Sequence, residues 1–241
     1  MITWHIGCSG FHYKHWKEFF YPPKLPQNKW FEFYCQHFNT VELNVTFYRF
    51  PQLSFLESWY NRSPEEFMFS VKAPRGITHY KQFHGTEELI GQFYNVIREG
   101  LKEKLGCVLF QLPPRSAYTP ERLNRIINSL DPAFNNVLEF RHPSWWVTEV
   151  YEMLSENRIT FCGMSHPLLP NDIIQNSGVL YYRFHGVPVL YKSQYDIKIL
   201  EDFVEDVTKA ARVKDAYIYF NNDIGGSAIT NGKQMQDIIK R

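Results

Sequence analysis

Long apolar runs are missing from this 241-residue sequence. None approaches the roughly 18 residues that a membrane-spanning helix needs. The first residues, MITWHIGCSG, also lack the basic segment and the following apolar segment of a secretory signal. We therefore expect a cytoplasmic protein with no membrane partner.

Cysteine is scarce and shows no recognisable spacing. The four cysteines are Cys8, Cys35, Cys107 and Cys162. They form no C-x-x-C pair, and their spacing suggests neither a metal site nor a disulfide framework. Three of them lie in strand-like apolar runs, where a free thiol behaves as a small buried hydrophobe. This pattern is typical of a protein from a reducing compartment.

An excess of one charge is also absent, because 26 Lys and Arg face 25 Asp and Glu, for a net charge of +1. Overall electrostatics thus give no reason to expect a nucleic acid or an anionic membrane as partner, and a local basic cluster would be needed for either. Internal repeats, linkers and low-complexity tracts are missing too. We expect residues 1–241 to form one domain.

Eight runs rich in β-branched and aromatic residues, bounded by Gly, Pro or polar clusters, predict strands. These runs are Thr3–Ser9, Thr40–Phe47, Phe67–Pro74, Gly106–Pro113, Asn136–His142, Thr160–His166, Val179–Gly186 and Ala216–Asn222. Helical patterns are found at Asn28–His37, Gln52–Asn61, Thr86–Lys104, Pro120–Leu130, Trp146–Asn157, Tyr195–Val213 and Ser227–Lys240. Thr119 is expected to cap the fourth helix, with Pro120 in its first turn.

Strands that alternate with helices predict a parallel sheet, because parallel neighbours need a crossover connection. Eight such units in about 250 residues match the size of an α/β protein with a (β/α)8 TIM-like barrel, which is the fold we expect. The connection Pro167–Gly178 is too short and too rich in proline for a full helix, so a loop or a single turn is expected there. A doubly wound open sheet is the alternative, but the G-x-G-x-x-G motif that it would favour is missing.

Alternation of side chains along the strands predicts a polar barrel interior. The apolar positions of each strand should face the helices, which leaves the opposite positions facing the barrel axis. The charged side chains assigned to the interior in this way are Glu42, Lys72, Glu139, Arg141 and Arg183, and the polar ones include Asn44, Ser70, His185 and Asn221. Burying five charges without partners would be prohibitive, so they must pair with each other, with water or with a ligand.

Three cations against two carboxylates leave one positive charge in this interior. That excess would favour an anionic ligand such as a phosphate or a carboxylate. The alternative is an ionic network that satisfies itself and only sets the fold. We favour a functional role, because buried ion pairs often add little stability.

Seven motifs follow one another from the first strand to the last helix. They are IGCSG with Tyr13, Lys14 and Trp16, FNTVELN with TFY, VKAPR with Thr78 and His79, LFQLPP, EFRHPSW, RFHG and YFNN. Block by block, these motifs resemble the DUF72 family of YecE-like proteins. The resemblance implies a TIM-barrel fold. It implies no reaction, since the function of that family is unknown.

Active sites of TIM barrels lie at the carboxyl ends of the strands, where these motifs place polar side chains. We assign Glu42 and Glu139 as a general acid–base pair, Lys72 as an electrophile or charge stabiliser, and His185 as a proton shuttle. For Lys72, a Schiff base with a carbonyl substrate and a salt bridge beside Glu42 are both open, and the salt bridge is favoured. The residues assigned to substrate binding are Tyr13, Asn44, Arg75, Gln111, Arg141, Arg183, Asn221, Asn222, Gly225 and Gly226.

The two glycines of this set, Gly225 and Gly226, would let backbone N–H groups approach an anion at the start of the last helix, and the alternative is a simple turn. No metal site is predicted, because Lys and Arg would oppose a cation at the mouth. The sequence leaves the identity of any cofactor open.

Aromatic residues are abundant, with 20 Phe, 15 Tyr and 6 Trp. Several follow strands on the expected mouth side, among them Tyr13, Trp16, Phe19, Tyr48 and Trp145. They could form stacking walls around a sugar or a base, with arginines binding phosphates. A hydrophobic lid that packs over the barrel is an equally good interpretation.

The leading hypothesis is an enzyme of unknown reaction that binds a small anionic, phosphate- or carboxylate-bearing molecule at the barrel mouth. A second hypothesis is a nucleic-acid-binding protein or phosphodiesterase, loosely similar to barrel endonucleases. It predicts affinity that falls steeply with salt. A third is a non-catalytic protein that binds a ligand without turnover. The sequence leaves the oligomeric state open.

Overall fold

Eight parallel strands close into a barrel in their order along the chain in the computed structural model, which describes residues 1–241. The strands are β1 (Thr3–Cys8), β2 (Thr40–Leu43), β3 (Met68–Lys72), β4 (Leu105–Gln111), β5 (Asn136–Glu139), β6 (Thr160–Ser165), β7 (Val179–Phe184) and β8 (Asp215–Phe220). The barrel closes between β1 and β8, where Thr3 pairs with Asp215 and Cys8 with Phe220. This closure confirms the predicted barrel and excludes the open sheet.

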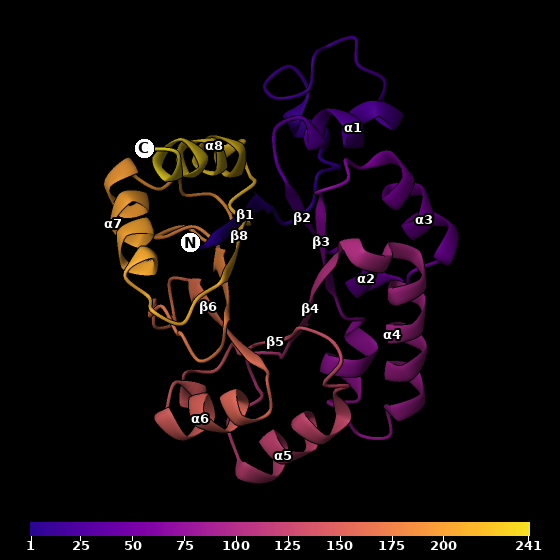
Figure 1. Ribbon diagram of the computed structural model, residues 1–241, viewed down its shortest axis with the longest axis vertical. Coiled ribbons are helices and arrows are strands. Elements are labelled where there is room, and N and C mark those ends of the chain that lie inside the picture. Colours follow the sequence, from indigo (N-terminus) through magenta and orange to yellow (C-terminus); the bar gives the residue numbers. More distant parts are fainter.

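Helices surround the strands as a ring (Figure 1). They are α1 (Trp30–Cys35), α2 (Val45–Tyr48), α3 (Leu53–Arg62), α4 (Glu87–Leu101), α5 (Pro120–Ser129), α6 (Thr148–Glu156), α7 (Ile197–Thr208) and α8 (Ser227–Ile239). Short turns of helix are η1 (Lys14–Trp16), η2 (Gln27–Lys29), η3 (Gly76–Tyr80), η4 (Lys102–Lys104) and η5 (Pro143–Trp145). The Thr119 side chain caps α5 by accepting from the N–H of Arg122, and no helix lies between β6 and β7, as the sequence predicted.

The second predicted strand is too long. Thr40–Phe47 continues its alternation of apolar and polar residues, but β2 ends at Leu43 and the chain turns into α2. The hydroxyl of Thr46 lies 2.8 Å from the carbonyl of Leu43 and 2.6 Å from that of Lys72, which holds this turn. Val45 is therefore 51% exposed instead of facing a helix, and Asn44 follows the strand rather than lying in it.

The core has two parts, one on each side of the barrel wall. The larger lies between the strands and the helices. The smaller fills the barrel and consists of Cys107, Leu109, Val137, Cys162, Tyr181, Tyr217 and Tyr219. Its tyrosines need polar partners, and the Tyr219 hydroxyl lies 2.7 Å from that of Thr40 and donates to Ser70 at 2.8 Å. Polar residues that face the barrel axis, such as Thr40 and Ser70, thus provide hydrogen bonds to the tyrosines that fill the barrel centre.

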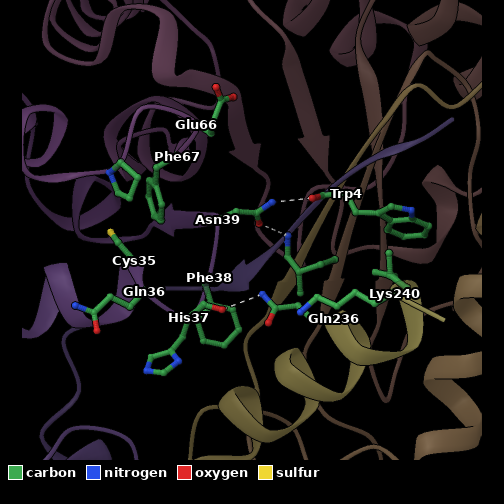
Figure 2. A pocket seen from close by; sticks show the side chains of 13 residues that line it. Trp4, Cys35, Gln36, His37, Phe38, Asn39, Glu66, Phe67, Gln236 and Lys240 are labelled. Atoms are coloured by element: carbon green, nitrogen blue, oxygen red, sulfur yellow. Dashed lines mark hydrogen bonds between the residues drawn. The ribbon is translucent and has the colours of Figure 1, made fainter.

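The amino-terminal end of the barrel has a pocket of about 380 Å³ between α1 and α8 (Figure 2). Two of its polar side chains, those of Asn39 and Gln236, form hydrogen bonds with the backbone. Asn39 donates to the carbonyl of Trp4 and accepts from the N–H of Ile6, and Gln236 donates to the carbonyl of His37. This end of a TIM barrel generally serves stability, and the contacts here fit that role. None of the helices combines the length and the apolar character that a bilayer crossing requires.

Candidate functional site at the barrel mouth

Arg183, at the end of β7, is the centre of a buried ionic cluster. Its Nη2 donates to Oε1 of Glu42 and its Nη1 to Oε2 of Glu139, both at 2.6 Å. The guanidinium is 1% exposed, and the two carboxylates are fully buried. Tyr181 donates its hydroxyl to the other oxygen of Glu42 at 2.6 Å. This part of the interior therefore satisfies its own charges.

Arg141, just beyond β5, extends the cluster toward the mouth. Its Nε donates to Glu139, and its Nη2 lies 3.0 Å from Nε2 of His185. The remaining nitrogen, Nη1, has no hydrogen-bond partner in the protein. Burial alone would raise the pKa of Glu139, but Arg141 and Arg183 outweigh it and hold that pKa well below its usual range. Glu139 therefore stays ionised, whereas a general acid must be protonated before it can donate a proton.

His185 is buried under Arg141 and uses both ring nitrogens within the protein. Nε2 faces Arg141, and Nδ1 lies 3.0 Å from the amide of Asn221. Burial, followed by the charges of Arg141 and Arg183, lowers the pKa of His185 well below its usual value. The ring is therefore neutral at pH 7 and fixed in place. Both features fit a positioning group better than a shuttle to solvent.

Lys72, the last residue of β3, differs from the other interior cations. Its Nζ donates to Oε1 of Gln111 at 2.5 Å and lies 4.4 Å from the ring centre of Phe47. No carboxylate lies within 4.0 Å of it, so the expected salt bridge with Glu42 is not formed. Burial, aided by the charge of Arg183, lowers the pKa of Lys72 to about 8.

A pocket of about 370 Å³ lies above this cluster, and it is lined by Gln111, Pro114, Arg141, His142, Pro143, His166, Leu168, Leu169, Leu190 and Tyr191. Four of these side chains offer N–H donors, and Tyr191 adds a hydroxyl. Gln111 has its oxygen occupied by Lys72, which leaves the amide NH2. Arg141 offers Nη1. His142 and His166 accept at Nδ1 from the backbone N–H groups of Ser144 and Leu168, which leaves Nε2 as the N–H donor of each ring.

The structure divides the predicted binding residues between two pockets. Gln111 and Arg141 line the one above the cluster, whereas Tyr13 and Asn44 line another, of about 570 Å³, beside the loop after β1. The Oδ1 atom of Asn44 is buried there without a partner. Tyr13 donates its hydroxyl to the carbonyl of Ser9 at 2.6 Å. The pocket linings do not include the buried residues beneath them, which are Glu42, Lys72, Glu139, Arg183 and His185.

Four other predicted binding residues lie apart from this arrangement. Arg75 is exposed and lies over the rings of Tyr48 and Tyr80. Asn222 is buried and donates to the carbonyl of Ser193 and to Asn231 of α8. Gly225 and Gly226 form a left-handed turn in which the N–H of Gly226 donates to Asp223. A side chain at Gly226 would meet the ring of Phe19 at 2.5 Å, so this ring covers the turn.

Most of the aromatic residues near the mouth pack into the fold. Trp16 and Trp145 are fully buried, and Trp145 stacks on Phe140 with ring centres 4.0 Å apart. Phe19 and Tyr48 remain exposed. The interpretation as a hydrophobic lid therefore fits the buried rings, and only the exposed rings of Phe19 and Tyr48 can serve as stacking surfaces.

A family model described as "Protein of unknown function DUF72" matches residues 5–241. The chain belongs to the DUF72 family. A curated relative is the UPF0759 protein YunF of Bacillus subtilis, 30% identical over 254 residues, which cover 91% of this chain and 89% of YunF. The UPF0759 protein YecE of Escherichia coli K12 is 30% identical over 118 residues, 48% of this chain and 42% of YecE.

Solved structures agree with this assignment. A DUF72 family protein from Thermotoga maritima has 28% sequence identity and a TM-score of 0.89, covering 99% of this chain and 100% of that one. One from Enterococcus faecalis V583 has 21% identity and a TM-score of 0.82, covering 99% and 96%, and shows the fold alone. The motif-based resemblance and the TIM-like barrel are both confirmed.

Eight of the ten residues that line the pocket above the cluster in this DUF72 protein escaped the sequence-based assignment, among them His166 and Tyr191. His166 follows β6 as directly as His185 follows β7, so the rule of polar residues after buried strands would have found it. Tyr191 lies in an irregular loop without a motif, and no sequence signal pointed to it. No group of three His, Cys, Asp or Glu side chains is arranged to hold a metal ion.

Proposed function

We propose that this DUF72 protein binds a small anionic molecule, bearing a carboxylate or a phosphate, in the pocket above the ionic cluster. The observation that carries the proposal is the donor character of the pocket. Gln111, Arg141, His142 and His166 all offer N–H groups to it, and no carboxylate lines it. An anion accepts hydrogen bonds and donates none, so such a pocket is complementary to it.

Charge supports the same ligand class. Arg183 is neutralised by two glutamates, whereas Arg141 shares Glu139 with it and Lys72 has no carboxylate at all. The cluster therefore keeps one excess positive charge below the pocket. Leucine and proline side chains line the rest of the pocket, which suits a ligand with a short apolar body. Glu42 and Glu139 serve in this proposal to hold the arginines in place.

The test is calorimetric titration with three probes of similar shape: benzoate, phenyl phosphate and neutral benzamide. We expect the two anions to bind and benzamide to bind far more weakly. Arg141→Gln should weaken the anions about 10- to 100-fold, because a hydrogen bond to a charged group is lost. His166→Phe, which leaves the ionic cluster intact, should weaken them less. Arg75→Gln, an exposed arginine outside the pocket, is the matched control.

Equal affinity for benzamide and benzoate would contradict the proposal, as would Arg141→Gln and His166→Phe variants that bind like the wild type. Binding without turnover of any carboxylate or phosphate ester would leave a ligand-binding protein rather than an enzyme.

Nucleic-acid binding is a second candidate, favoured by one surface cluster. The guanidinium of Arg75 lies 5.7 Å from the ring centre of Tyr48 and 5.3 Å from that of Tyr80. Both rings are about two-thirds exposed, at 65% and 67%. Bases can stack on such rings. Fluorescence anisotropy with a short single-stranded DNA should show affinity that falls with salt and is lost in Arg75→Gln. Binding unaffected by either would argue against this candidate.

A further inference from the structure

We propose that the amine of Lys72 forms a Schiff base with a small carbonyl compound that carries an anionic group, with 2-oxo acids as the simplest class. This inference rests on the anion pocket proposed above. It concerns a covalent step, for which the family assignment gives no indication.

The hydrogen bonding of Lys72 leaves its amine available. An ammonium group has three N–H donors. Nζ of Lys72 uses one, to the neutral amide oxygen of Gln111, and makes no other hydrogen bond. Lys104 provides the internal comparison, since it is similarly buried at 6% exposure against 8% for Lys72. Nζ of Lys104 makes three bonds, to the carbonyls of Tyr60 and Ser63 and to the hydroxyl of Ser63.

The surroundings of Lys72 make its amine easier to deprotonate than that of an ordinary lysine. No carboxylate lies within salt-bridge distance to hold the proton, and the ring of Phe47 covers one side at 4.4 Å. Burial and the neighbouring Arg183 lower the pKa of Lys72 to about 8, so a fraction of the amine is unprotonated at neutral pH. A lysine desolvated beside other cations is a known way to activate this nucleophile.

The position of Lys72 selects the substrate class. Gln111 bonds to Lys72 and also lines the pocket, together with Arg141. A ligand whose carboxylate or phosphate is bound by the pocket donors can therefore direct a neighbouring carbonyl toward Lys72. In a 2-oxo acid the carbonyl carbon is bonded directly to the carboxylate. Lys72 also ends β3 on the side of a TIM barrel where catalytic groups are found.

The step balances without a further reactant. The unprotonated amine attacks the carbonyl carbon, a C–N bond forms and the carbonyl oxygen becomes a hydroxyl. That hydroxyl takes up the proton that the amine had released and leaves as water. Overall, one ammonium and one carbonyl give one iminium and one water, and the positive charge is conserved.

Reductive trapping tests this inference. The wild-type protein is incubated with pyruvate and sodium borohydride, and the adduct is located by intact mass and peptide mapping. We expect one reduced pyruvate adduct, on the peptide with Lys72, that depends on both reagents and decreases when benzoate competes. The peptide with Lys104 should stay unmodified, and Lys72→Arg should abolish the adduct. Trapping should increase with pH through about 8 rather than through the roughly 10.4 of an ordinary lysine.

Adducts spread over surface lysines such as Lys81, or no adduct at all, would overturn the Schiff base. Peptide mapping of the wild type decides this even if Lys72→Arg fails to fold. Benzoate titration separates the two proposals. If benzoate binds and no adduct forms, only the Schiff base fails, whereas absence of anion binding removes the pocket proposal itself.

Discussion

Removing the guanidinium of Arg183 tests whether the ionic cluster holds the barrel together. Arg183 is the only cation within salt-bridge distance of Glu42, whereas Glu139 retains Arg141. In Arg183→Met, the Glu42 carboxylate stays fully buried with only the Tyr181 hydroxyl as partner. Removing one member of a buried pair costs about 3–5 kcal/mol. For a chain of this size, that lowers the melting temperature by about 6–20 °C.

The assay is thermal unfolding followed by circular dichroism at pH 7. The double variant Glu42→Gln/Arg183→Met removes the isolated charge, and we expect it to melt at a higher temperature than Arg183→Met alone. A loss below about 3 °C, or a double variant no more stable than the single one, would refute this reasoning.

Two further predictions concern stability. Because the folded-state pKa of His185 is lowered, its neutral form stabilises the fold above the unfolded value of about 6.5, and this contribution is lost as the pH falls below it. Urea unfolding from pH 7 to pH 5 should therefore show a free energy of unfolding that decreases by about 1.4 kcal/mol per pH unit below 6.5. His185→Gln should make this pH dependence less steep, and an unchanged slope in that variant would contradict the assignment. In α4, Gly91→Ala meets nothing within 4 Å and should stabilise by about 0.5–1 kcal/mol. Gly100→Ala would place Cβ 2.5 Å from that of Leu56 and should destabilise by about 1–3 kcal/mol, so equal effects in urea unfolding would argue against the packing described for this helix.

The barrel could be predicted because its strands are short, apolar and separated by helical patterns. The prediction of a strand over Thr40–Phe47 failed because the end of β2 is fixed by a contact with another strand. Period-two alternation continues past Leu43, and only the bonds of the Thr46 hydroxyl to two carbonyls, one of them on β3, show that the strand has ended. Such a contact joins residues far apart in sequence, so a pattern along one segment cannot contain it.

Part of the candidate site could be predicted from the alternation of side chains along the strands. This alternation was enough to place Glu42, Lys72, Glu139 and Arg183 inside the barrel, where the structure has them. The partners of these side chains depend on distances across the barrel, which the sequence of one strand does not specify. For this reason the bond of Lys72 to Gln111, in place of Glu42, could not be predicted. His166, which lines the pocket above the cluster, was not among the residues assigned from the sequence.

The two bonds of Arg183 also bear on how the chain folds during synthesis. Glu42 lies 141 residues before Arg183 in the sequence, and Glu139 lies 44 residues before it. A nascent chain that has released only the first half of the barrel contains Glu42 without the cation that compensates it. An early half-barrel would then leave this carboxylate in water or bury it at high cost. We therefore expect stable closure only after β7 and β8 have left the ribosome, which makes this barrel a single late-folding unit rather than two halves that fold in turn.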